Sequence, residues 1–166
     1  MGNRGGRIHD PATRAIIRRQ ASRRWIYCVL SFKGRRRRVM GEGYTELFFL
    51  DEASALAAGH RPCFECQRER AKEFARLLGM TRADEIDAAL GRQRSAERVK
   101  VDARALPDGA MIAIDGEAYL ICEEAARRWN GAGYREPKAI PAEALLLTPP
   151  LTLAAIRAGF APAIAA

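Results

Sequence analysis

Two thiols, Cys63 and Cys66, form a Cys-x-x-Cys motif that directly follows Arg61-Pro62. Such a turn supplies two of the four ligands of a tetrahedral metal site, with Zn²⁺ as its most frequent occupant. The same spacing also occurs in redox dithiols and in buried cysteine pairs, but no thioredoxin-like strand-helix-strand pattern precedes this one. We therefore predict one structural zinc ion per chain, held by Cys63 and Cys66.

The remaining zinc ligands must come from elsewhere in the sequence. His60 lies three residues before Cys63, Cys28 lies in a predicted strand, and His9 lies near the N-terminus. We take His60 and Cys28 as the principal candidates and His9 as the other alternative. Cys122 is flanked by Leu120 and Ile121, which indicates a core position.

Positive charge is concentrated at the start of the chain. The formal net charge is +8, and twelve of the 28 Lys and Arg residues fall within the first 40 positions, where Asp10 is the only acidic residue. Guanidinium groups bind phosphate bidentately, and interleaved aromatic rings can stack on bases. The residues predicted to contact DNA or RNA are Arg18, Arg19, Arg23, Arg24, Trp25, Tyr27, Arg35, Arg36, Arg37 and Arg38. A solvated face or a flexible basic arm is the alternative interpretation.

The first half of the chain alternates strand and helix signals. Trp25 to Phe32 and Tyr44 to Leu50 read as strands, with 35–40 as a possible partner in a hairpin. Asp51 and Gly59 are suitable caps for a helix between them. A second helix is expected from Cys66 to Leu78, and a third after Thr81, with a possible interruption at Gly91.

The second half is expected to form a small antiparallel sheet or barrel with a closing helix. Asp115-Gly116 between two apolar runs indicates a hairpin. Another strand is predicted at 144–147 and a helix at 152–158. Residues 91–104 are polar, so we divide the chain into a basic, metal-binding half (1–90), a linker (91–104) and a β-rich half (105–166). The expected fold class is α+β, with a small zinc-knuckle-like N-terminal half.

Composition limits the class of protein and its cellular location. The chain has 166 residues, of which 48% are hydrophobic, so it can bury a core. No stretch approaches the roughly 18 to 20 apolar residues that cross a bilayer, and we expect no membrane association. Four cysteines without an apolar signal region predict a reducing, cytoplasmic location.

About 20 residues carry a family resemblance. Phe48-Phe49, Glu52-Ala53, Ala58-Gly59 and Arg61-Pro62-Cys63-x-x-Cys66 resemble the end of the zinc-binding module of Ada-type DNA-repair proteins. The resemblance implies a zinc site with Cys63 and Cys66 as its second ligand pair, and contact with DNA. The family's first pair is Cys-x-x-x-Cys, whereas here Phe32 follows Cys28 at that offset. With one thiol fewer, we expect no methyl transfer.

Together these features predict a zinc-binding, nucleic-acid-binding protein, with DNA repair or recognition of modified bases as its setting. We favour a role without catalysis. The alternatives are a nuclease with a divalent metal on Glu46 or Asp51 and His9 as base, a thiol-based transferase, and a protein-interaction module with a basic arm. The second half could also be a PUA-like barrel that reads RNA or modified bases, which is an analogy of fold alone.

Overall fold

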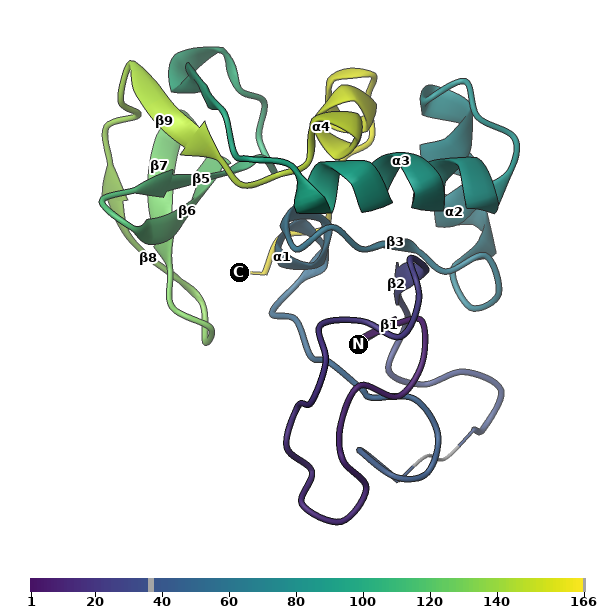
Figure 1. Ribbon diagram of the computed structural model, residues 1–166. Helices are drawn as coiled ribbons and strands as arrows, with labels where there is room; N and C mark the ends of the chain where they lie inside the picture. The colour runs from purple at the N-terminus through teal and green to yellow at the C-terminus, as the bar shows by residue number, and fades with distance from the viewer. Residues whose placement is uncertain (36–37, 166) are drawn as a thin grey trace.

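The computed structural model describes residues 1–35 and 38–165, and it confirms an α+β fold (Figure 1). The N-terminal part contains a three-stranded sheet and three helices: β1 (Gly2–Arg4), β2 (Trp25–Tyr27), α1 (Glu52–Ala57), β3 (Arg61–Pro62), α2 (Arg68–Leu77) and α3 (Ala83–Ser95). The C-terminal part contains β4 (Lys100–Asp102), a 3-10 turn at Ala103–Ala105, β5 (Met111–Ile114), β6 (Glu117–Cys122), β7 (Ala125–Trp129), β8 (Tyr134–Lys138), β9 (Glu143–Leu146) and α4 (Pro150–Arg157). None of the helices in the described residues has the length and apolar character to cross a membrane.

The small sheet has the order β1-β2-β3, and it combines both pairing directions. β1 and β2 are antiparallel, whereas β2 and β3 are parallel, with Ile26 opposite Arg61 and Tyr27 opposite Pro62. Helix α1 begins where predicted, because the Asp51 side chain accepts a hydrogen bond from the Ser54 N–H at 2.8 Å. Gly59 ends the helix with φ of 81°, a conformation that glycine adopts without strain.

The large sheet has the order β4-β9-β5-β6-β7-β8 and is antiparallel throughout. The predicted hairpin at Asp115-Gly116 joins β5 to β6, and both turn residues have positive φ, at 53° and 82°. Strands β7 and β8 were not predicted. The turn before β7 consists of Glu123 and Glu124, also at positive φ, which are not residues that normally signal such a turn.

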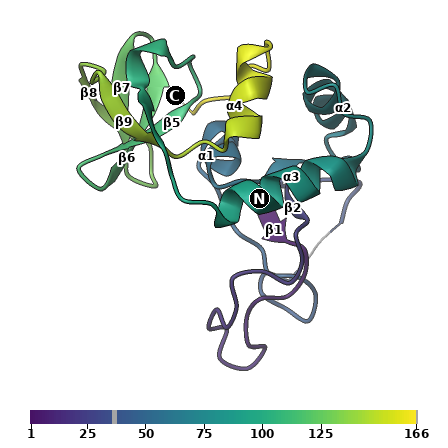
Figure 2. The ribbon, with the colours of Figure 1, turned by 45° about the horizontal axis from the view of Figure 1, so that its top comes forward.

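Helix α4 contributes to the buried core of each part. Ala155 of α4 and Phe160 beyond it pack with Phe74 and Leu90 of the N-terminal helices, while Leu153 of α4 packs against the large sheet. Figures 1 and 2 both show α4 between the large sheet and helix α2, and α4 contacts α3. The closing helix therefore joins the two halves.

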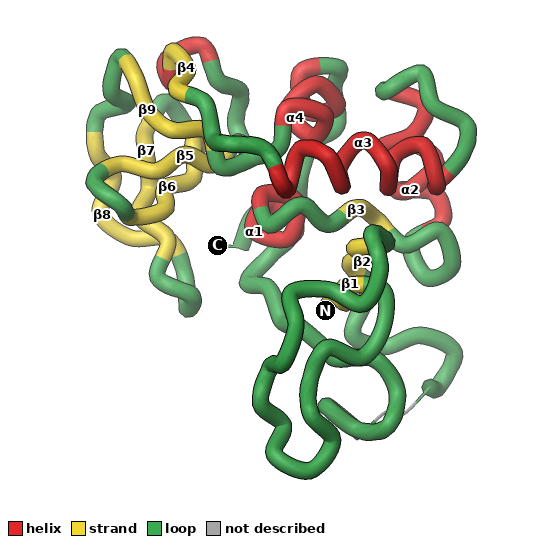
Figure 3. Tube along the Cα trace, viewed as in Figure 1, coloured by secondary structure: helices red, strands yellow, loops and turns green. Residues whose placement is uncertain are grey.

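Three local predictions differ from the structure. The strand expected over Trp25 to Phe32 ends at Tyr27, and Leu30 is exposed. Tyr44 to Leu50 contributes a single bridge, between Leu47 and Gly2, in place of a strand. Helix α3 continues through Gly91 to Ser95, because the fully buried Leu90 holds this part of the helix against the core. As a result, long loops run between β1 and β2 and between β2 and α1, as Figure 3 shows.

Candidate metal centre

Three thiols from separate segments of the chain come together beside the small sheet. The sulfur atoms of Cys28, Cys63 and Cys66 all lie within 4.8 Å of one another. Among the described residues, this is the only group of three or more His, Cys, Asp or Glu side chains arranged to hold a metal ion. The structure therefore brings together three of the five residues that the sequence suggested as ligands.

Parallel strand pairing accounts for the meeting of Cys28 and Cys63. Each cysteine is the first residue beyond its strand, Cys28 after β2 and Cys63 after β3. Because Tyr27 lies opposite Pro62, the next residues of both strands lie side by side. The Cys63 N–H donates to the Tyr27 carbonyl oxygen at 3.1 Å, which continues the pairing up to the thiols.

A tight turn carries the chain from Cys63 to Cys66. The Glu65 N–H donates to the Cys63 sulfur at 3.4 Å, and the Gln67 N–H donates to the Cys63 carbonyl oxygen at 3.0 Å. The Gln67 side chain also donates to the Tyr27 carbonyl oxygen at 3.0 Å, which ties the start of α2 to the end of β2. Backbone amides pointing at sulfur stabilise the thiolate that a metal requires.

The three thiols differ in proton affinity. A hydrogen bond from the Cys28 thiol, together with the N–H groups of Cys66 and Glu65, lowers the pKa of Cys63 to about 5. That same hydrogen bond to Cys63, followed by burial, raises the pKa of Cys28. Burial raises the pKa of Cys66. Cys63 is thus the thiol that most readily carries negative charge.

The donor set fits a soft or borderline cation. Tetrahedral Zn²⁺ with bonds of roughly 2.3 Å to sulfur places its thiolates about 3.8 Å apart, which is compatible with the upper limit of 4.8 Å observed here. Thiolates also favour Cu(I) and iron over Mg²⁺ or Ca²⁺, which prefer oxygen ligands. The arrangement can bind a metal ion through three sulfurs.

The histidines lie outside this cluster. His60 is 0% exposed and lies between Trp25 and Phe49, with ring centroids 5.1 and 4.7 Å away. It precedes the short extended strand that leads to Cys63, and side chains three residues apart on a strand point to opposite faces. This alternation explains why the proximity of His60 in sequence does not place it with the thiols. His9 instead bonds to the Thr45 hydroxyl at 2.6 Å.

His60 should make stability depend on pH. Burial, reinforced by the positive charges of Arg4 and Arg94, lowers the pKa of His60 to about 3. Between that value and the usual pKa of about 6.5, the unfolded chain binds the proton and the folded chain does not, so stability falls as pH falls. From pH 7 to 5, we expect His60 to account for a loss of about 2 kcal/mol.

Urea unfolding at several pH values measures this effect. A His60→Leu variant, compared with the wild type, should lose less stability between pH 7 and 5 by about that amount, because it has no imidazole to protonate. Acid release of a metal would affect both proteins alike, so their difference isolates the histidine. Parallel pH profiles for the two proteins would contradict the prediction.

The predicted nucleic-acid contacts divide into exposed and buried residues. Arg36 and Arg37 fall outside the described residues. The other predicted arginines are exposed on the long loops: Arg18, Arg19, Arg23, Arg24, Arg35 and Arg38. Trp25 and Tyr27 are only 3% and 5% exposed. Their burial conflicts with the prediction that they stack on bases, because β2 directs both rings into the protein.

Arginines cover the Trp25 ring. The guanidinium carbons of Arg4 and Arg94 lie 4.1 and 4.4 Å from its centroid. The Tyr27 hydroxyl donates to Glu52. Charge density along the sequence identified the exposed arginines, but Arg94 lies far from the basic segment, and only the fold shows its contact with Trp25.

The carboxylates of the nuclease alternative have structural partners. Asp51 caps α1 and accepts a hydrogen bond from the Tyr134 hydroxyl at 2.8 Å. Glu46 accepts a hydrogen bond from the Met40 N–H at 2.8 Å. Both interactions stabilise the long loop and its junction with α1.

No protein-family model, curated protein or solved structure matches this chain. The thiol cluster, the distribution of charge and the shape of the surface are the features of the molecule that bear on its function.

Proposed function

We propose that this chain is a zinc-binding protein that binds DNA or RNA through its basic N-terminal loops. The single observation that carries the zinc proposal is the convergence of Cys28, Cys63 and Cys66 within 4.8 Å. Three thiolates supply three of the four positions of a tetrahedral zinc ion, so the fourth ligand comes from outside this cluster. The resemblance of Phe48–Cys66 to the Ada-type zinc module is consistent with the same metal.

The zinc ion has a structural role in this proposal. Its thiolates come from the end of β2, the end of β3 and the turn before α2. A bound ion would cross-link these three points, which support the long loops on either side of β2. Stabilising a small domain whose loops bury little apolar surface is a common role of zinc.

Exposed arginines supply the proposed contacts with phosphate. Within the described residues, Arg24 forms an ion pair with Asp84 at 3.8 Å, and Arg35 forms one with Glu65 at 2.6 Å. Arg18 and Arg23 are exposed and form no ion pair with a carboxylate of the described residues. Exposed guanidinium groups bind phosphates and release counterions, so affinity falls with added salt.

Salt titration tests the nucleic-acid proposal. If four arginines contact a labelled single strand, the association constant should fall about 50-fold between 50 and 200 mM salt, as measured by fluorescence anisotropy. An Arg18→Gln, Arg23→Gln variant should reduce the slope by roughly 1.4 log units per decade of salt. An Arg76→Gln, Arg157→Gln variant, which removes the same charge from exposed sites on α2 and α4, is the matched control.

A salt response that is flat, or that changes equally in both variants, would refute phosphate contact by the loops. An absence of binding to both DNA and RNA would favour an acidic protein partner for the basic segment instead.

A further inference from the structure

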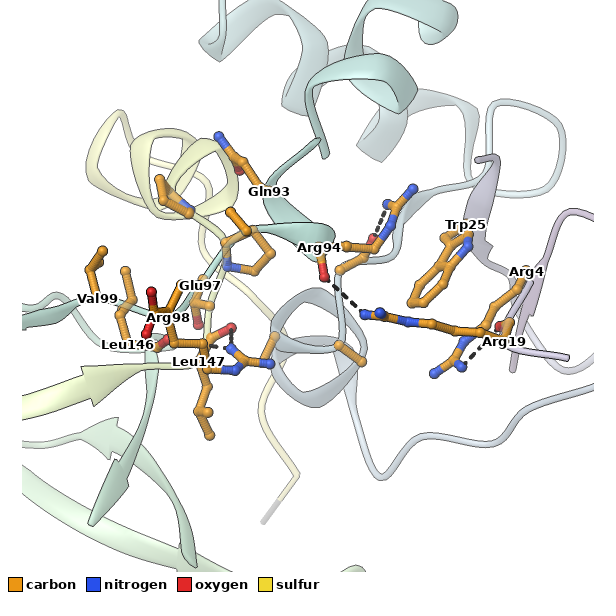
Figure 4. Close-up of a pocket in the computed structure, with 17 residues that line it drawn as sticks. Arg4, Arg19, Trp25, Gln93, Arg94, Glu97, Arg98, Val99, Leu146 and Leu147 are labelled. Atoms are coloured by element: carbon orange, nitrogen blue, oxygen red, sulfur yellow. Dashed lines mark hydrogen bonds between the residues drawn. The ribbon is translucent and has the colours of Figure 1, made fainter. Parts of the chain in front are cut away.

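Two cavities with shared lining residues, together called the cleft here, lie along the junction of the two halves. One has a volume of about 430 Å³ and is lined by Arg4, Arg19, Arg94 and Arg98 (Figure 4). The other has a volume of about 330 Å³ and is lined by aromatic and apolar side chains that include Phe48 and Trp129. Both cavities include Arg98 in their lining, together with Ala57, Ala58 and Leu147. Each lies in the size range of small-molecule sites.

Four arginines are among the residues that line the first cavity. Figure 4 shows Arg4, Arg19 and Arg94 together on one side and Arg98 across from them. None of the four belongs to an ion pair with a carboxylate among the described residues, and Glu97 is the one carboxylate among the described residues that line the cavity. This end of the cleft therefore has an excess of positive charge.

Backbone carbonyls hold these arginines in place. Arg19 donates to the carbonyl oxygen of Arg94 at 2.9 Å, and Arg94 donates to that of Gly59 at 2.8 Å. Arg98 donates to the carbonyl oxygen of Leu147 at 2.8 Å. Burial lowers the pKa of Arg94 to about 10; the charge of Asp87 opposes this shift, and the charges of Arg19 and Arg4 add to it. An anion in the cavity would offset both the burial and the repulsion.

Aromatic rings are exposed at the other end of the cleft. Phe48 is 60% exposed and Trp129 is 38% exposed, and Met111 and Leu147 supply further apolar lining. Trp25 lies at the basic end, but Arg4 and Arg94 lie against its ring. Phe49 also lines this cavity, but its ring packs against the buried His60. The exposed rings that can accept a stacked base are therefore Phe48 and Trp129.

We propose that the cleft binds a nucleotide unit of a single strand, with its phosphate at the four arginines and its base stacked on Phe48 and Trp129. The proposal deepens the proposed function, and rests on it, by placing the strand in a particular site. A clustered positive charge beside exposed aromatic rings is the combination that binds single-stranded nucleic acid without strict sequence preference. A base paired within a duplex cannot present its face to these rings, so a single strand is the expected ligand.

Binding of a short labelled single strand to the full, metal-loaded chain tests this site. Trp129→Ala should weaken binding about 5- to 150-fold, as expected for the loss of one stacked base, while Trp129→Phe should stay close to the wild type. Arg19→Gln, Arg98→Gln should weaken binding and lower the salt slope by roughly 1.4, unlike the control pair Arg76→Gln, Arg157→Gln. Thermal melts establish that each variant is folded.

A second probe, inorganic polyphosphate, separates stacking from charge. Because it has no bases, its affinity should fall in the arginine variant and stay unchanged in Trp129→Ala. If the wild type binds the single strand and both cleft variants bind it equally well, the cleft proposal is overturned while the proposed function stands. If the wild type binds no strand at all, the proposed function itself fails.

Discussion

Replacing Cys63 with serine is expected to abolish stoichiometric zinc binding and to unfold or severely destabilise the N-terminal half. Cys63 is the thiol that accepts hydrogen bonds from both the Cys28 thiol and the Glu65 amide, so its loss removes a ligand and disrupts the turn. Structural zinc contributes on the order of 10 kcal/mol in small zinc domains, which is comparable to the whole stability of a typical protein. We expect metal affinity to fall more than about 100-fold.

Elemental analysis of purified protein and thermal melts with and without a chelator measure these changes. The wild type should carry one zinc ion per chain, and chelation should lower its melting temperature. Cys122→Ser is the matched control, because Cys122 is a free thiol on β6 that is not part of the cluster. Cys28→Ser should behave like Cys63→Ser. Wild-type protein that contains no metal and melts at the same temperature in chelator would refute the zinc proposal.

The second large effect is expected from Asp87→Ala, at about 3 to 5 kcal/mol of lost stability. Asp87 on α3 accepts two hydrogen bonds from Arg61, both at 2.8 Å, and both side chains are buried. Removing the carboxylate leaves an arginine buried without its counter-charge. Because Arg61 is two residues before Cys63, this pair also anchors the thiol turn to α3.

Urea unfolding gives the free-energy difference directly. Asp84→Ala, on the same helix, is the matched control, because its ion pair with Arg24 is exposed and 3.8 Å long. We expect this control to cost at most about 1 kcal/mol. Equal losses in the two variants would show that the buried pair has no special contribution.

Short-range signals in the sequence predicted much of the local structure. The caps of α1 at Asp51 and Gly59 and the hairpin at Asp115-Gly116 follow from the backbone preferences of a few adjacent residues. The same holds for Cys63-x-x-Cys66, whose spacing alone places two thiols in one turn. Such preferences depend on neighbours along the chain, so they can be recognised without the fold.

The long-range arrangement could not be predicted in this way. Trp25 and Tyr27 follow the alternating pattern of a strand, but this pattern does not show which face of the strand is buried and which is exposed. In the structure both rings are buried. The turn at Glu123-Glu124 joins β6 to β7 with both residues at positive φ, a conformation that glutamate rarely adopts, so the sequence contains no turn signal before β7.

The sequence by itself determined the pair of thiols at Cys63 and Cys66, the basic segment and the α+β class. Only the tertiary structure decided that Cys28 joins the pair and that His60 does not, and that Arg94 and Arg98 line a cleft with Arg4. The physical reason is separation along the chain. Parallel pairing of β2 with β3 brings together residues that are 35 positions apart, such as Tyr27 and Pro62, and this pairing forms only when the whole core packs.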